Sequence, residues 1–199
     1  MKSGRRKIKY KIGIFGSNLR DKFISKGTIK KINELSDSLS NENVILVTGA
    51  CSGIPYKVAS NAAKKNVEVF GYSPANNFSG QKQFASQDDQ SVYKKLFYIP
   101  NNFPLNSDSL VCKKYRNVVS IANCDAGIII SGRWGTMNEF TNLYDMEKVI
   151  GVLTGTGGIA DELQRLLKKI IKKNKSVVIF DSSPDRLVRK IIKELNSRI

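Results

Sequence analysis

Residues 126–143 read Ala-Gly-Ile-Ile-Ile-Ser-Gly-Arg-Trp-Gly-Thr-Met-Asn-Glu-Phe-Thr-Asn-Leu. The apolar run 126–130 is typical of a strand that is buried on both faces, and a helix-like pattern follows it after two glycines. A strand that ends at glycine and continues as a helix leaves unpaired N–H groups and a positive dipole end facing outward. This arrangement favours anions such as phosphate, and we expect Glu139, in the first turn of the helix, to lie beside the anion.

Short apolar runs alternate with amphipathic stretches over the whole chain of 199 residues. Strands are predicted at 10–15, 44–48, 67–72, 127–131, 149–153 and 177–180, with a seventh candidate at 96–99. Helices are predicted at 30–39, 56–65, 110–123, 138–146, 160–172 and 184–195, the last opening with Pro184 behind Ser182 or Ser183 as the cap. This order predicts an α/β fold with residues 1–199 in one domain: a Rossmann-like three-layer sandwich with a mostly parallel sheet of six or seven strands.

The section 73–108 interrupts this alternation with prolines, paired asparagines and paired aspartates. A long polar excursion in a compact domain is either a lid over a ligand or a disordered surface. Both interpretations stay open at this point.

Composition excludes several functions. The chain has no histidine, which removes Ser-His-Asp and Cys-His catalysis and any His-ligated metal site. Its three cysteines, Cys51, Cys112 and Cys124, are widely spaced, so neither a disulfide framework nor a zinc site is predicted. We therefore expect no metal and no bound cofactor.

The net charge of +16 raises the question of nucleic acid, but the lysines are scattered over predicted helices. A solvated basic surface is favoured over a DNA or RNA groove, so nucleic acid is an unlikely partner. Because no apolar run could span a bilayer and no secretory signal is evident, we expect a cytoplasmic protein without a membrane partner.

Four glycine-bearing turns follow predicted strands, where ligands bind in open parallel sheets. They lie at 13–17, 48–53, 131–136 and 154–158. Their number favours nucleotide binding over purely structural glycines, with Gly16, Ser17, Gly49 and Gly53 as binding candidates in the first two turns. The chain lacks the full G-x-G-x-x-G spacing, an acidic residue at the end of the second strand, and a G-x-x-x-x-G-K-[ST] loop, so a mononucleotide is favoured over a dinucleotide or ATP.

The pattern Gly132-x-x-Gly135-Thr136-x-x-Glu139, preceded by Arg116 and by Asn-Cys-Asp-Ala at 123–126, resembles the signature of the LOG family, also labelled lysine decarboxylase-like. Residues 48–55 resemble the second glycine turn of that family, and the similarity runs from about residue 11 to 187. Family members are Rossmann-like and usually dimeric. Characterised ones hydrolyse the N-glycosidic bond of nucleoside 5′-monophosphates, which releases the free base and ribose 5-phosphate.

The resemblance implies a role for each matching residue. Gly132, Gly135 and Thr136 would hold the phosphate, Glu139 would be the catalytic carboxylate, and Arg116 would be its partner at the reacting sugar. It also implies a homodimer or higher homo-oligomer. Cleavage of an N-ribosyl bond develops positive charge on the sugar, which a carboxylate stabilises while it orients water.

Three positions depart from the family pattern. Arg133 stands where glycine is common, Asn138 where many active members have a second glutamate, and Asn117 where a lysine often follows the arginine. Arg133 either strengthens phosphate binding or fills the pocket. Trp134 either stacks on a base, and so joins the nucleotide-binding candidates, or anchors the loop or a dimer face.

Purely structural roles for the two catalytic candidates stay open as well. Glu139 could merely complement a helix dipole, and Arg116 could form a surface ion pair. Two alternatives to the hydrolase follow: a non-catalytic binding or carrier protein for a nucleotide or nucleotide-like cofactor, as the family includes a molybdenum-cofactor carrier, and a Rossmann module that binds single-stranded DNA.

Overall fold

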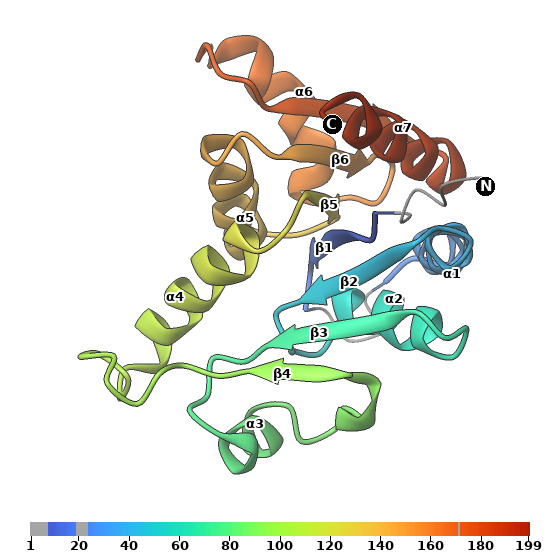
Figure 1. Cartoon of the computed structure of the whole chain (residues 1–199). Coiled ribbons are helices and arrows are strands. Elements are labelled where there is room, and N and C mark those ends of the chain that lie inside the picture. Colours follow the sequence, from blue (N-terminus) through green and yellow to red (C-terminus); the bar gives the residue numbers. More distant parts are fainter. Residues whose placement is uncertain (1–7, 19–23, 171) are drawn as a thin grey trace, which may run out of the picture.

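The computed structural model of the protein describes residues 8–18, 24–170 and 172–199. Within these residues, strands and helices alternate along the chain (Figure 1). The strands are β1 (Tyr10–Gly16), β2 (Val44–Thr48), β3 (Glu68–Tyr72), β4 (Lys95–Phe97), β5 (Ala126–Ile130), β6 (Val149–Leu153) and β7 (Val177–Asp181). The helices are α1 (Lys26–Ser40), α2 (Ile54–Ala63), α3 (Phe78–Phe84), α4 (Ser109–Ala122), α5 (Trp134–Asp145), α6 (Ile159–Lys169) and α7 (Pro184–Ser197), with a short 3-10 helix η2 (Gln90–Val92).

The described strands form one sheet of seven, in the order β4-β3-β2-β1-β5-β6-β7, and every neighbouring pair is parallel. The chain builds outward from β1 to one edge, then returns to the other side of β1 with β5. The strand order therefore reverses between β1 and β5, and such a switch point is where ligands bind in open α/β sheets. The last residue of β1, Gly16, is in register with Ile130, the last residue of β5.

Helices cover both faces of the sheet (Figure 1). On β1, Ile12 and Ile14 point into the core shared with α1, α2 and α7, whereas Phe15 points into the core shared with α5 and α6. This covering explains why the central strands β5 and β6 are apolar throughout, since every residue in them is buried. The predicted single-domain, Rossmann-like three-layer sandwich is confirmed, and the candidate seventh strand forms as β4.

Two helices begin four residues earlier than the periodicity predicted. In α1, Ser25 caps the N-terminus by accepting a hydrogen bond from the backbone N–H of Thr28 at 3.1 Å. In α5, Arg133 is the N-cap in an extended conformation, and Gly135 continues the helix instead of delaying it. The prediction that Glu139 lies in the first turn was therefore wrong, because a helix that starts at Trp134 places this residue in the second turn.

The section 73–108 contains α3, η2 and β4, and it is organised around a buried glutamine. The amide nitrogen of Gln81 donates to the backbone oxygen of Ala50 at 2.8 Å. Its amide oxygen accepts a hydrogen bond from the hydroxyl of Ser73 at 2.5 Å. These bonds attach α3 to the turn after β2, so α3 has a fixed place beside the carboxyl ends of the strands.

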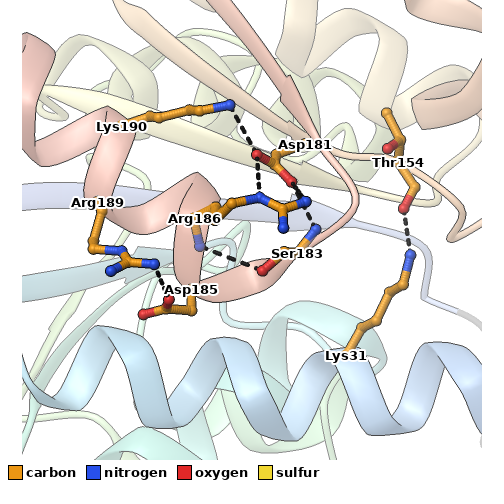
Figure 2. Close-up of polar contacts among 8 residues, drawn as sticks. All are labelled: Lys31, Thr154, Asp181, Ser183, Asp185, Arg186, Arg189 and Lys190. Atoms are coloured by element: carbon orange, nitrogen blue, oxygen red, sulfur yellow. Dashed lines mark hydrogen bonds and ion pairs between the residues drawn. The ribbon is translucent and has the colours of Figure 1, made fainter.

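The carboxyl end of β7 carries a second buried polar group, Asp181 (Figure 2). Its carboxylate accepts two hydrogen bonds from the guanidinium of Arg186, at 2.9 and 3.2 Å, and one from the ammonium of Lys190 at 2.9 Å. The backbone N–H of Ser183, the N-cap of α7, is a further donor at 2.8 Å. These donors, of which Arg186 has the largest effect, hold the pKa of Asp181 far below its ordinary value. They also fix the start of α7 on the sheet.

None of the helices among the described residues is long and apolar enough to cross a membrane.

Candidate functional site

A cavity of about 630 Å³ opens at the switch point, between the end of β1, the turn after β2 and the helices α4 and α5. Seven of the predicted site residues line it: Gly16, Ser17, Arg116, Arg133, Gly135, Thr136 and Glu139. Its wall also includes eight residues that the sequence reasoning did not select as site residues: Asn18, Cys51, Ser52, Phe84, Leu110, Lys113, Lys114 and Asn117.

The turn from β5 into α5 forms one wall of the cavity. No side chain caps the N-terminus of α5, so its first N–H groups and dipole act on the cavity. Gly132 has φ +98°, and a Cβ there would lie 2.5 Å from the Cβ of the buried Thr136. A Cβ at Gly135 would meet no atom within 4 Å, so a ligand has room to approach the backbone there. This wall is suited to an anion.

The turn after β1 forms the adjacent part of the wall and is supported by the N-cap of α2, Gly53. Gly53 has φ +105°, and a Cβ at this position would collide with Asn18 and with the backbone oxygen of Ser17. That oxygen accepts a hydrogen bond from the N–H of Ile54 at 2.9 Å. The hydroxyl of Ser17 is buried and has no hydrogen-bond partner among the described residues. An unpaired buried hydroxyl costs free energy that a bound ligand could recover.

Arg116 projects from α4 and is only 8% exposed. Its guanidinium donates to the backbone oxygen of Gly49, and any side chain at position 49 would occupy the place of the guanidinium. Its Nε is buried and finds no partner in the part of the chain that the structure describes. Gly49 therefore supports the site from behind, and Arg116 lies inside the molecule rather than in a surface ion pair.

Glu139 is half-buried on α5, and its pKa is raised to about 7. Burial is the main cause, and the positive charges of Arg116 and Lys114 and a hydrogen bond from Thr136 offset only part of it. Among the described residues, no ion pair within 4.0 Å joins Glu139 to a cation. Both protonation states are thus populated near neutral pH, as is common for carboxyl groups that transfer protons.

The two asparagines that depart from the LOG pattern contact each other. The amide nitrogen of Asn117 on α4 donates to the amide oxygen of Asn138 on α5 at 3.1 Å. The amide oxygen of Asn117 is buried, and none of the described residues donates a hydrogen bond to it. A neutral amide pair therefore joins the two helices beside Glu139, where a lysine and a glutamate would have placed charges.

Arg133 lies at the rim of the cavity. Its guanidinium donates to the amide oxygen of Asn18 at 2.5 Å, which joins the turns after β1 and β5. The side chain of Arg133 is exposed, and the cavity behind it is open. A neutral partner leaves the positive charge of Arg133 available to an anion.

Trp134 is 84% exposed and is not among the residues that line the cavity. It is the first residue of α5, and its ring points away from the core. Its predicted contact with a nucleotide stays a prediction.

The glycine turn after β6 does not line this cavity, although it was counted among the four binding turns. The N–H groups of Gly155 and Gly157 donate to the carboxylate of Asp161, at 2.6 and 2.9 Å. The ammonium of Lys31 donates to the backbone oxygen of Thr154 at 2.6 Å (Figure 2). The chain's own carboxylate thus occupies the anion-binding position of this turn, which makes the turn structural.

The same turn and the start of α6 form hydrogen bonds with the backbone of the candidate phosphate site. The N–H of Ile159, at the start of α6, donates to the backbone oxygen of Gly132 at 2.9 Å. The hydroxyl of Thr156 accepts from the N–H of Ser131 at 2.8 Å. These bonds stabilise the positive φ angles of Ser131 and Gly132, and so hold the α5 N-terminus in place.

The charges around the cavity favour an anionic ligand. Lys113, Lys114, Arg116 and Arg133 line it, against the single carboxyl group of Glu139. Within the described residues there is no cluster of three or more side chains that could hold a metal ion. The site combines an open helix N-terminus, several cations and one carboxyl group with a raised pKa.

Solved structures with the same fold include proteins with different ligands. TM1055 aligns with a TM-score of 0.73 and 17% identity, over 93% of this chain and 99% of that chain. The molybdenum cofactor binding protein from the phototrophic bacterium Rippkaea orientalis aligns with a TM-score of 0.64 and 16% identity, over 95% and 98% of the two chains. DNA processing protein A from Helicobacter pylori, which binds single-stranded DNA, aligns with a TM-score of 0.59 and 16% identity, over 93% and 81%.

At these identities the similarity establishes the fold. No curated protein sequence matches the chain. The model of the SLOG cluster4 family matches residues 9–188, nearly the whole chain, and agrees with the resemblance carried by the glycine turns. The protein belongs to the SLOG cluster4 family, whose LOG-like, Rossmann-type fold is a nucleotide-binding fold.

Proposed function

We propose that this protein binds a nucleoside 5′-monophosphate at the switch point and hydrolyses its N-glycosidic bond, which yields the free base and ribose 5-phosphate. The observation that carries the proposal is the position of Glu139. It faces the same cavity as the buried Arg116 and the uncapped N-terminus of α5.

In this proposal the phosphate binds at the start of α5. The backbone at Gly135 is open to close approach, Thr136 lines the cavity, and Arg133 adds a positive charge to its wall. Ser17 lines the same cavity, in the turn after β1. A phosphate bound here fixes the ribose near the middle of the cavity, close to Glu139.

The reaction breaks the bond between the anomeric carbon and the base nitrogen, and the electron pair leaves with the base. The ionised Glu139 stabilises the positive charge that develops on the ribose and accepts a proton from the attacking water. The water oxygen forms the new bond to the anomeric carbon, and the proton passes to the departing base. Arg116, which lines the cavity, positions the sugar.

The test is to incubate the protein with AMP, GMP, CMP and UMP and to measure free base by chromatography. We expect release from at least one nucleotide, and a loss of about 100-fold or more in rate for Glu139→Gln. Glu34→Gln, at an exposed position of α1, is the matched control and should keep the full rate. No base release from any of the four, or equal rates for the wild type and Glu139→Gln, would refute hydrolysis.

A non-catalytic binding or carrier protein is the second candidate, and the Asn117–Asn138 pair favours it. This pair replaces two charges beside the carboxyl group, and one solved structure of the same fold is a molybdenum cofactor binding protein. Such a protein would show a rise in melting temperature with a nucleotide, because a ligand of the native state stabilises it by mass action, but no base release.

We also propose that the protein forms a homodimer. Three large apolar side chains are exposed on α4 and at the start of α5: Leu110, Val118 and Trp134, at 70%, 43% and 84%. Light scattering at micromolar concentration tests this, and a mass of a single chain would refute it.

A further inference from the structure

A second cavity, of about 590 Å³, adjoins the first and has no role in the proposed reaction. The two cavities share the side chains of Phe84 and Lys113 in their walls. The second cavity lies between the segment that enters α3 and the N-terminal end of α4. A ligand in the first cavity can therefore extend past Phe84 into the second.

Helix α4 runs along both cavities and gives their spacing. Arg116 lines the first cavity, Lys113 lines both, and Cys112 and Ser109 line the second. Because an α-helix rises about 1.5 Å per residue, Cys112 lies about 6 Å and Ser109 about 10 Å from Arg116 along the axis. A base that extends about 6–10 Å from a ribose at Arg116 therefore reaches the second cavity.

The lining of the second cavity combines apolar residues with four amide side chains, those of Asn76, Asn77, Gln83 and Asn106. Asn77 and Asn106 each use one amide atom within the protein: Asn77 accepts from the N–H of Gly80 at 2.9 Å, and Asn106 donates to the backbone oxygen of Asn101 at 2.7 Å. Within the described residues, the NH2 group of Asn77 and the amide oxygen of Asn106 have no partner. The cavity thus offers a donor and an acceptor, which suits the hydrogen-bonding edge of a nucleobase.

Phe84 supplies an aromatic surface at the boundary between the cavities. It is the last residue of α3 and is 40% exposed, and the ammonium of Lys113 lies 5.5 Å from the centre of its ring. The buried Gln81 holds α3 in place through Ala50 and Ser73, so the ring has a fixed position. A base that leaves the first cavity can stack on this ring.

We infer that the second cavity is the base-binding subsite, where a purine stacks on Phe84 and its unmodified edge hydrogen-bonds to Asn77 and Asn106. A purine is favoured because two fused rings cover the phenyl ring while their far edge still reaches the amides. An alkyl group on the exocyclic nitrogen of adenine would remove a donor and place apolar atoms against polar ones. The inference rests on the proposed function, which places the ribose phosphate in the first cavity.

The test is calorimetric binding in the Glu139→Gln background, where the ligand is not consumed. We expect AMP or GMP to bind at least about tenfold more tightly than ribose 5-phosphate, because stacking and edge contacts add to the phosphate contacts. UMP and an N6-alkylated AMP should bind more weakly than AMP. Phe84→Ala should remove about tenfold of the AMP affinity and leave the ribose 5-phosphate affinity unchanged, which also shows that the variant is folded.

Phe78→Ala is the matched control, since Phe78 lies at the other end of α3, is 47% exposed and lines neither cavity. It should leave the affinity for AMP unchanged. The inference is overturned if ribose 5-phosphate binds as tightly as AMP, if the alkylated nucleotide binds more tightly, or if Phe78→Ala weakens binding as much as Phe84→Ala. Failure of all nucleotides and of ribose 5-phosphate to bind refutes the proposed function, and this inference with it.

Discussion

Replacing Glu139 by glutamine should make the protein more stable at alkaline pH, even though it removes the proposed catalytic group. Glutamine has nearly the same shape but no charge, so the change isolates the cost of an ionised carboxylate at this position. Burial raises the pKa of Glu139 from the ordinary 4.5 to about 7. A group whose pKa is raised on folding stabilises the native state below its unfolded pKa, and this contribution is lost as the pH rises through the folded pKa.

The size of the effect follows from the shift. A rise from 4.5 to about 7 corresponds to about 3.4 kcal/mol at high pH, because one pKa unit is worth about 1.36 kcal/mol. Glu139 is half-buried and its surroundings can relax, so we expect about 2 kcal/mol. For a domain of this size, that free energy raises the melting temperature by about 4–8 °C.

The assay is urea or thermal unfolding of both proteins at about pH 5 and about pH 8. At about pH 8, Glu139→Gln should be more stable by about 2 kcal/mol, whereas at about pH 5 the difference should fall below about 1 kcal/mol. Glu34→Gln, the exposed control on α1, should show neither the gain nor its pH dependence. A Glu139→Gln protein that is equally or less stable at about pH 8 would refute the argument that burial sets this pKa.

Two further predictions concern carboxylates whose hydrogen-bond donors come from the protein itself. Asp181→Asn should destabilise the protein by about 2 kcal/mol at neutral pH, because a buried carboxylate with two cationic partners loses its charge. Since the folded pKa of Asp181 lies below the ordinary 3.8, this difference in stability should shrink as the pH falls below about 4. The control is Asp185→Asn, which removes an exposed ion pair with Arg189 and should have little effect in the same urea titrations. Asp161→Ala should cost about 1–2 kcal/mol by leaving two backbone N–H groups of the β6 turn unpaired, with no change in AMP affinity by calorimetry.

The fold could be predicted from the sequence because its determinants are local. Short β-branched runs such as Val44–Thr48 and Val149–Leu153 form strands at the predicted residues. A strand that is buried on both faces is apolar at every position, and this pattern is visible in the sequence without knowledge of the neighbouring strands. Helix starts were less predictable, because they depend on which residue caps. Arg133 caps α5 by its backbone conformation alone, without the serine or aspartate that usually indicates a start.

The glycine turns identified the walls of the candidate site, but not which turn is open to a ligand. The turn at Gly155 resembles the one at Gly132 in composition, and only the position of Asp161 shows that its N–H groups are already bound. Contacts across the sheet were equally hidden: Arg133 meets Asn18, a partner 115 residues away in the sequence. Such pairs depend on the order of the strands, which no local pattern contains.

Asp181 and Glu139 are both carboxyl groups withdrawn from water at the carboxyl edge of the sheet, and their pKa values are shifted in opposite directions. Asp181 has a full set of donors from its own chain, so its charge is stabilised and it has no remaining capacity for a ligand. Glu139 has no cation within ion-pair distance among the described residues, and the nearby Arg116 spends its hydrogen bond on Gly49.

A carboxyl group whose charge is opposed by burial, and only partly stabilised by its neighbours, destabilises the free protein at neutral pH. A ligand that brings further donors recovers part of that free energy. The hydroxyls of a ribose and an attacking water are such donors. The neutral Asn117–Asn138 pair adds no further charge beside Glu139, so burial outweighs the effect of Arg116 and Lys114 on its pKa. The ionised carboxylate is therefore stabilised by the protein's own donors at Asp181 and opposed by burial at Glu139. This difference is the physical reason to assign a structural role to Asp181 and the proposed catalytic role to Glu139.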